Sequence, residues 1–95
     1  STMTREQLER AAESMHAAAE AAAHVDEDAA QRLTDLAEQT DDLATGEQGP
    51  DHGRLARLLN ALDEVKTGLD KDDAEDAIDE AKASLTAYRE TVEGV

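Results

Sequence analysis

The residues best suited to chemistry lie in the first quarter of the chain, where carboxylates and imidazoles recur at helical spacing. Glu13 and His16 have the Glu-x-x-His spacing that supplies two metal ligands from one helix in di-metal bundles. Such bundles need a second copy of the motif, and neither His24 nor His52 has a glutamate three residues earlier. Glu20 lies four residues from both His16 and His24, so either pair shares a helical face. His16, Glu20 and His24 are therefore weak candidates for a transition-metal site, and a solvated helix face is the simpler interpretation.

Two acidic runs, at residues 26–28 and 70–73, raise the question of calcium binding. An EF-hand loop needs a glycine at its sixth position and a glutamate at its twelfth, and neither run has that glycine. Acids before an apolar run are typical of helix N-termini, so we interpret both runs as helix caps. The sequence also contains no glycine-rich phosphate loop and no nucleophile elbow. We therefore predict a protein that is not an enzyme and has no cofactor.

The stretch at residues 49–59 separates two helical halves and holds the only proline. Pro50 and Asp51 suit the start of a helix, because proline fixes a helical φ and aspartate accepts hydrogen bonds from free backbone N–H groups. Gly53 is unusual inside a helix, where it costs about 1 kcal/mol relative to alanine. It therefore indicates either a close approach by another segment or a helix that begins later.

Arg54 and Arg57 are three residues apart and share one face of the helix that follows, and His52 lies nearby in the sequence. Cations near a helix N-terminus oppose the helix dipole, so a compensating partner is expected. We predict that the arginines pair across the turn with carboxylates of the preceding helix, namely Glu38, Asp41 or Asp42. The alternative is that His52, Arg54 and Arg57 form a recognition site for an anion or an acidic partner.

Residues 49–57, GPDHGRLAR, and the C-terminal run from Tyr88 to Val95, YRETVEGV, carry a resemblance to a known family. The chain resembles small, uncharacterised, acidic helical proteins of haloarchaea, of the Halobacterium salinarum type, over essentially its whole length from Met3. The resemblance implies a high-salt origin and an all-helical fold. It implies no activity and identifies no functional residue.

The charge balance is strongly acidic, with 24 acids against 9 basic residues and a formal net charge of −15. Evenly spread acids and abundant alanine are consistent with a high-salt cytoplasm, where the Debye length is only about 3 Å at 1 M salt. Nucleic-acid binding is disfavoured because it needs a basic surface. The chain has no cysteine for disulfide or thiolate chemistry. No apolar run approaches the length of a membrane span, so we expect a cytoplasmic protein without membrane contact.

Apolar residues recur at helical spacing on both sides of the central turn, and no strand pattern is present. We predict a single all-α domain, an antiparallel bundle of helical hairpins. It has four helices, or three if the helix from residue 4 continues through the acids at 26–28. The expected boundaries are a disordered N-terminus at 1–3, a first helical half at 4–44, a turn at 45–53 and a second half at 54–95. Tyr88, the only aromatic residue, is expected in the core.

The core predicted from this pattern is small, because the first helix carries mainly alanine and the chain has no Phe or Trp. Alanine buries little area, and burial contributes roughly 25 cal/mol per Å². We therefore expect a homodimer that covers a self-association face made of Leu55, Leu58, Leu59 and Leu62. The predicted function is a protein-interaction or self-association module. The alternative is a ligand- or metal-binding bundle using the histidines described above.

Overall fold

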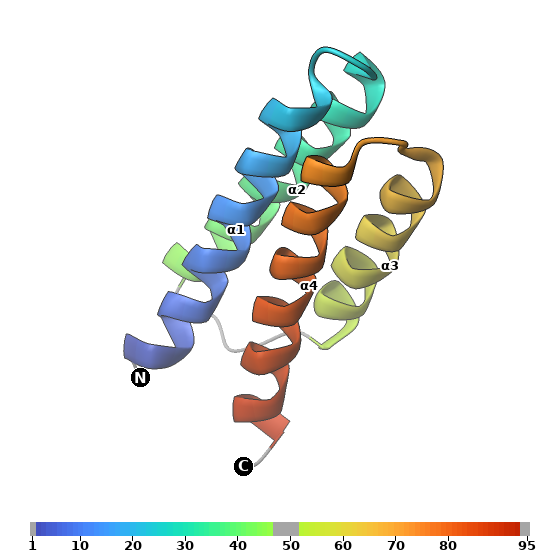
Figure 1. Cartoon of the computed structure of the whole chain (residues 1–95). Helices are drawn as coiled ribbons and strands as arrows, with labels where there is room; N and C mark the ends of the chain where they lie inside the picture. Colours follow the sequence, from blue (N-terminus) through green and yellow to red (C-terminus); the bar gives the residue numbers. More distant parts are fainter. Residues whose placement is uncertain (1, 47–51, 94–95) are drawn as a thin grey trace.

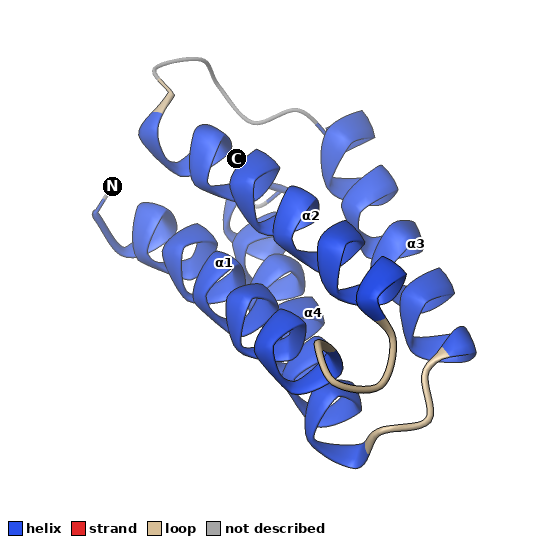
Figure 2. Ribbon diagram, turned by 90° about the horizontal axis from the view of Figure 1, so that it is seen from above, coloured by secondary structure: helices blue, strands red, loops and turns tan. Residues whose placement is uncertain are grey.

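The computed structural model describes residues 2–46 and 52–93, which form four helices. They are α1 (Thr2–Ala22), α2 (Glu27–Thr45), α3 (His52–Gly68) and α4 (Asp72–Glu93). Neighbouring helices run in opposite directions, and the α1–α2 and α3–α4 turns lie at the same end of the bundle (Figures 1 and 2). The predicted all-α bundle of helical hairpins is confirmed, with four helices rather than three.

Acidic residues separate α1 from α2, as their position in the sequence suggested. Asp26 is the N-cap of α2, with extended backbone angles of φ −156° and ψ 94°, and its side chain accepts a hydrogen bond from the Ala29 N–H at 3.0 Å. Glu27 and Asp28 follow in the first turn, where carboxylates stabilise the positive end of the helix dipole. The chain therefore turns here without a glycine or a proline.

Two predicted boundaries differ from the structure. Residues 2 and 3, which we expected to be disordered, belong to α1. The turn expected at 45–53 is shorter, because α2 includes Thr45 and α3 begins at His52. Gly53 therefore lies in an exposed first turn, and the burial of Leu55 in the same helix offsets its low helix propensity. Pro50 and Asp51 lie outside the described residues.

The core is centred on α1, which packs extensively along both α2 and α4. The fourth helix also supports α3, whereas α3 packs least extensively on α2. Large side chains that are fully buried come from every helix, and most of the alanines with no exposed area belong to α1 and α4. The large ones are Met15, Leu33, Leu55, Leu62, Ile78 and Leu85, and the alanines with no exposed area are Ala11, Ala18, Ala22, Ala37, Ala74 and Ala81. This distribution lets the helices approach closely around a narrow core.

The predicted self-association face is wrong, because its leucines lie inside the single chain. Leu55, Leu58 and Leu62 are 1%, 3% and 0% exposed, and Leu59 is partly buried against the same core. The periodicity correctly marked an apolar face, but α4 and α2 of the same chain cover it. A dimer through these four leucines would require the bundle to open.

Ion pairs on the outside of the bundle join α3 to α4. The Lys66 ammonium donates a hydrogen bond to Asp79 at 2.8 Å, and Lys82 pairs with Asp63. The hydrogen bond to Asp79 raises the pKa of Lys66 above its usual 10.5. Two of the three lysines are thus used within the fold, and the raised pKa of Lys66 keeps its pair with Asp79 charged into the alkaline range.

Tyr88 is in the core, as predicted, and should make the fold sensitive to alkaline pH. Its side chain is 8% exposed, and desolvation raises its pKa above 10.0 because burial disfavours the phenolate. The unfolded chain therefore loses this proton first. The contribution of protonated Tyr88 to folding stability is complete below about pH 10. It falls as the pH rises through the higher pKa of Tyr88 in the folded state.

Tyr88→Phe should therefore weaken the alkaline loss of stability. Thermal unfolding of the wild type and the variant, followed by circular dichroism from neutral pH to above pH 10, measures the difference. The remaining slope in the variant should come from Lys66, whose raised pKa acts in the same direction. Identical slopes in the two proteins would show that Tyr88 ionises equally in both states.

Candidate functional site

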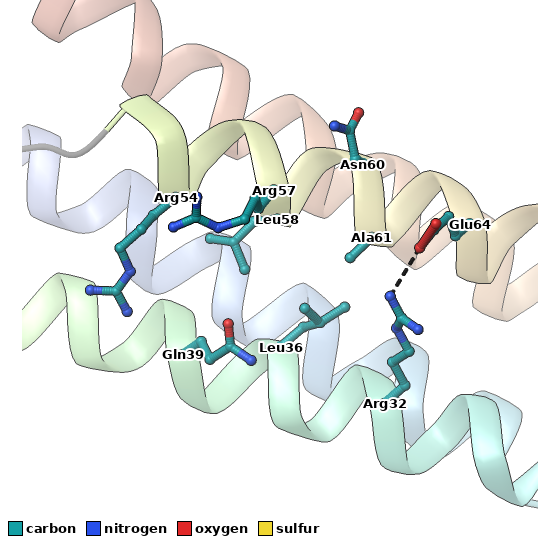
Figure 3. A pocket seen from close by; sticks show the side chains of 9 residues that line it. All are labelled: Arg32, Leu36, Gln39, Arg54, Arg57, Leu58, Asn60, Ala61 and Glu64. Carbon is teal, nitrogen blue, oxygen red and sulfur yellow. Dashed lines mark hydrogen bonds and ion pairs between the residues drawn. The ribbon is translucent and has the colours of Figure 1, made fainter.

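A groove of about 370 Å³ lies between α2 and α3, where these two helices are less closely packed. We call it the arginine groove. Its walls carry three arginines and two amides, its floor is apolar, and one glutamate lies at one end. The lining residues are Arg32, Leu36, Gln39, Arg54, Arg57, Leu58, Asn60, Ala61 and Glu64 (Figure 3).

Helical spacing places these side chains on facing surfaces. Arg32, Leu36 and Gln39 follow an i, i+4, i+7 pattern and therefore form one stripe of α2. Arg57, Ala61 and Glu64 repeat that pattern on α3, which runs in the opposite direction. The glutamate and arginine ends of the two stripes therefore meet, and the Arg32 guanidinium donates a hydrogen bond to the Glu64 carboxylate at 3.0 Å. This exposed ion pair is the polar bridge across the groove (Figure 3).

The groove gathers positive charge in a very acidic molecule. It contains three of the nine basic residues, against a single glutamate, in a chain with net charge −15. Arg54 is half-buried and Arg57 is exposed near the start of α3. The floor beneath them is formed by Leu36 and Leu58, which are 6% and 3% exposed. Such a surface can bind carboxylates on its arginine wall and exclude water at its floor.

The predicted pairing of Arg57 with Glu38, Asp41 or Asp42 is wrong. No ion pair joins Arg57 to any of these three carboxylates, all of which belong to the described residues. The stripe of α2 that faces α3 ends in Gln39, so the neighbouring Glu38 lies about 100° away around the helix. Asp41 instead faces α1, where its Oδ2 lies 3.6 Å from the Nε2 of His16.

The proposed metal ligands are only partly brought together. His16 and Glu20 line a wide groove of about 820 Å³ between α1 and α2, together with Glu13. His24 does not line it and is exposed in the turn after α1. Within residues 2–46 and 52–93, no group of three or more His, Asp or Glu side chains has a metal-binding arrangement. The geometry gives the metal-binding alternative no support.

The remaining sequence candidates lie apart from one another. His52 and Gly53 are exposed in the first turn of α3 and do not line the arginine groove. Tyr88 is in the core on α4. Sequence reasoning missed Arg32 and its partner Glu64, together with the amides Gln39 and Asn60 and the apolar Leu36 and Ala61. Arg32 lies four residues before Leu36 and so shares its helix face. That spacing identifies Arg32 as a groove residue only once it is known that this face of α2 lies against α3.

These features define a class: a four-helix bundle with an arginine-lined groove between its second and third helices. The described helices include none with the length and apolar character needed to cross a membrane. The chain belongs to a protein family of unknown function, DUF7553, whose model matches residues 3–91. No curated protein and no solved structure gives a match.

Proposed function

We propose that this protein is a non-enzymatic interaction module and that the arginine groove is its docking surface. The observation that carries the proposal is the grouping of Arg32, Arg54 and Arg57 beside an apolar floor in an otherwise acidic chain. The fitting occupant is a protein segment that presents carboxylates next to an apolar side chain. Carboxylates bind arginine through strong, charge-assisted hydrogen bonds, and the apolar side chain adds contact with Leu36 and Leu58.

The composition of the groove supports binding rather than catalysis. Its arginines and amides can hold and orient a ligand, but they are poor nucleophiles and poor general bases at neutral pH. Glu64 is the one carboxylate in the lining, and it is engaged with Arg32. A docking role also explains why a cation such as Arg57 is retained near a helix N-terminus without an ion pair among the described residues.

We also propose that the module works in a salt-rich cytoplasm. The net charge of −15 and the resemblance to haloarchaeal proteins support this setting. At molar salt, long-range steering between charged proteins is screened within a few ångströms. Under these conditions only short-range contacts discriminate between partners. The arginine groove offers two kinds of such contact: guanidinium groups that can pair with carboxylates, and an apolar floor.

Replacing Arg57 by glutamate should strongly weaken binding of an acidic, apolar probe. The probe is a synthetic peptide of glutamate and leucine, with a lysine–leucine peptide of equal length as its counterpart. The affinity of the acidic peptide, measured by calorimetric titration, should fall about tenfold or more in Arg57→Glu, because one attractive contact becomes repulsive. The lysine–leucine peptide should bind the wild type more weakly than the acidic one.

Arg10→Glu is the matched control. Arg10 is exposed on α1, which does not pack alongside α3, and it does not line the groove. The two variants have the same net charge, so a general effect of added acidity would affect both equally. Circular dichroism must show the same helicity in all three proteins. Equal loss of binding in Arg57→Glu and Arg10→Glu would refute the groove as the docking surface.

A further inference from the structure

The face formed by α2 and α3 has a charge polarity along the bundle. Arg54 and Arg57 form its basic end, near the start of α3. Past the Arg32–Glu64 pair the face becomes acidic, because a second groove of about 300 Å³ is lined there by Asp26 and Asp28. Arg32 and Glu64 line both grooves, so the two form one continuous furrow.

The two ends are separated by a distance that can be read from the helices. Because Arg32 faces Glu64 across antiparallel helices, Arg57 lies at the level of Gln39. Asp28 is eleven residues from Gln39, which corresponds to about 16 Å at the rise of an α-helix. The midpoint of this interval falls between the Arg32–Glu64 pair and Leu36, so the face is basic at one end, carries an ion pair and apolar side chains at its centre, and is acidic at the other end.

We infer that the occupant of the groove is a second copy of the chain, docked antiparallel through the same α2–α3 face. This inference rests on the proposed docking role of the groove and names its partner. A two-fold axis perpendicular to the helices, passing between the Arg32–Glu64 pair and Leu36, places each basic end against the acidic end of the partner. Each two-fold contact then occurs twice, as in any isologous interface: Arg57 meets the partner's Asp28, and Asp28 meets the partner's Arg57.

The ion pairs on the α3–α4 side favour the α2–α3 face over that side. Two copies of a chain with net charge −15 repel each other unless basic groups face acids locally. On the α3–α4 side, Lys66 and Lys82 are already paired with Asp79 and Asp63 of the same chain. The α2–α3 face brings Arg57 and Asp28 to the surface, neither of which has an ion pair among the described residues.

The size of the face also fits. The bundle is 41 Å long and about 20 Å across, so one side has the area of a standard interface, about 800 Å² per partner. The Arg32–Glu64 pair stays intact beside the axis. The apolar centre is narrow, so the complementarity of charge determines which face is used.

Reciprocal charge reversal tests the inference. Arg57→Glu places an acid at both contact positions, 57 and 28, and Asp28→Arg places a base at both. Each variant alone should be monomeric, with a mass near 10.2 kDa, at concentrations where the wild type has twice that mass. Mixed in equal amounts they should form a heterodimer, because every contact is again between opposite charges. Light scattering and sedimentation, in the lowest KCl concentration that keeps all three proteins helical, measure these masses.

The double variant Arg57→Glu, Asp28→Arg should restore the homodimer, and Arg10→Glu should leave it within about twofold of the wild-type dissociation constant. A wild type that stays monomeric from micromolar to millimolar concentration overturns the inference. So does an Arg57→Glu variant that dimerises as well as the wild type, or a mass that grows beyond the dimer, because a two-fold contact closes. A monomeric wild type that still binds the acidic peptide through Arg57 would leave the docking role in place with a different partner.

Discussion

Thermal unfolding of this protein should shift upward by about 10 °C or more between dilute buffer and molar KCl, because salt screens its self-repulsion. The chain carries a net charge of −15 on 95 residues, and its ion pairs involve exposed or half-exposed side chains. Such pairs contribute little, typically below about 1 kcal/mol each. Repulsion among the remaining acids therefore opposes the compact state at low ionic strength. Circular dichroism melts across a KCl series measure the shift.

A charge-reduced variant separates screening from general salting-out. Some acids are exposed and form no ion pair within the described part of the chain, and neutralising them should raise the midpoint in dilute buffer and flatten its dependence on KCl, without changing apolar burial. Suitable substitutions are Glu6→Gln, Glu38→Gln, Glu80→Gln and Glu90→Gln. If the wild type melts at the same temperature in dilute buffer and in molar KCl, self-repulsion is not limiting stability.

Leu62→Ala should destabilise the fold by about 2–5 kcal/mol, the usual range for emptying a leucine site in a core. Leu62 has no exposed area and lies among the largest fully buried side chains. The surrounding core has few other large residues to collapse into the cavity. Because domains of this size are stable by only about 5–15 kcal/mol, the variant should unfold at a much lower urea concentration than the wild type.

Leu59→Ala provides the comparison on the same helix. Leu59 is only partly buried against the core, so its replacement should lower the free energy of unfolding by less than half as much as Leu62→Ala. Both measurements belong in the same molar KCl. If the two variants lost equal stability, and the loss depended on protein concentration, the leucines would be stabilised by association rather than within the single chain.

Much of this fold could be predicted from the sequence because helix ends and helix faces are local properties. The acids at Asp26–Asp28 and the glycine at Gly68 mark an N-cap and a C-terminal end whose effects depend on a few neighbouring residues. Apolar periodicity likewise marked the buried side of α3 correctly. What covers that side is a non-local property, and we assigned Leu55, Leu58 and Leu62 to a partner when α4 and α2 of the same chain cover them.

The candidate site was less predictable because it depends on the rotation of one helix against another. Arg54 and Arg57 could be recognised as neighbours from their spacing alone. The surroundings of Arg57 depend on which stripe of α2 faces α3, and that stripe contains Arg32 and Gln39 rather than Glu38 or Asp42. A rotation of one residue, about 100°, decides whether an arginine meets a carboxylate or an amide.

The alanines of α1 limit how this sequence can drift over evolutionary time. Ala11, Ala18 and Ala22 have no exposed area, and α1 is the helix that packs on both α2 and α4. A larger residue at any of them would push α1 away from a helix that it packs against, and overpacking typically costs about 1–3 kcal/mol. A leucine elsewhere can be exchanged for isoleucine or methionine with repacking, but alanine has only glycine below it in size. In this bundle the smallest apolar side chains, rather than the largest, have the fewest acceptable replacements.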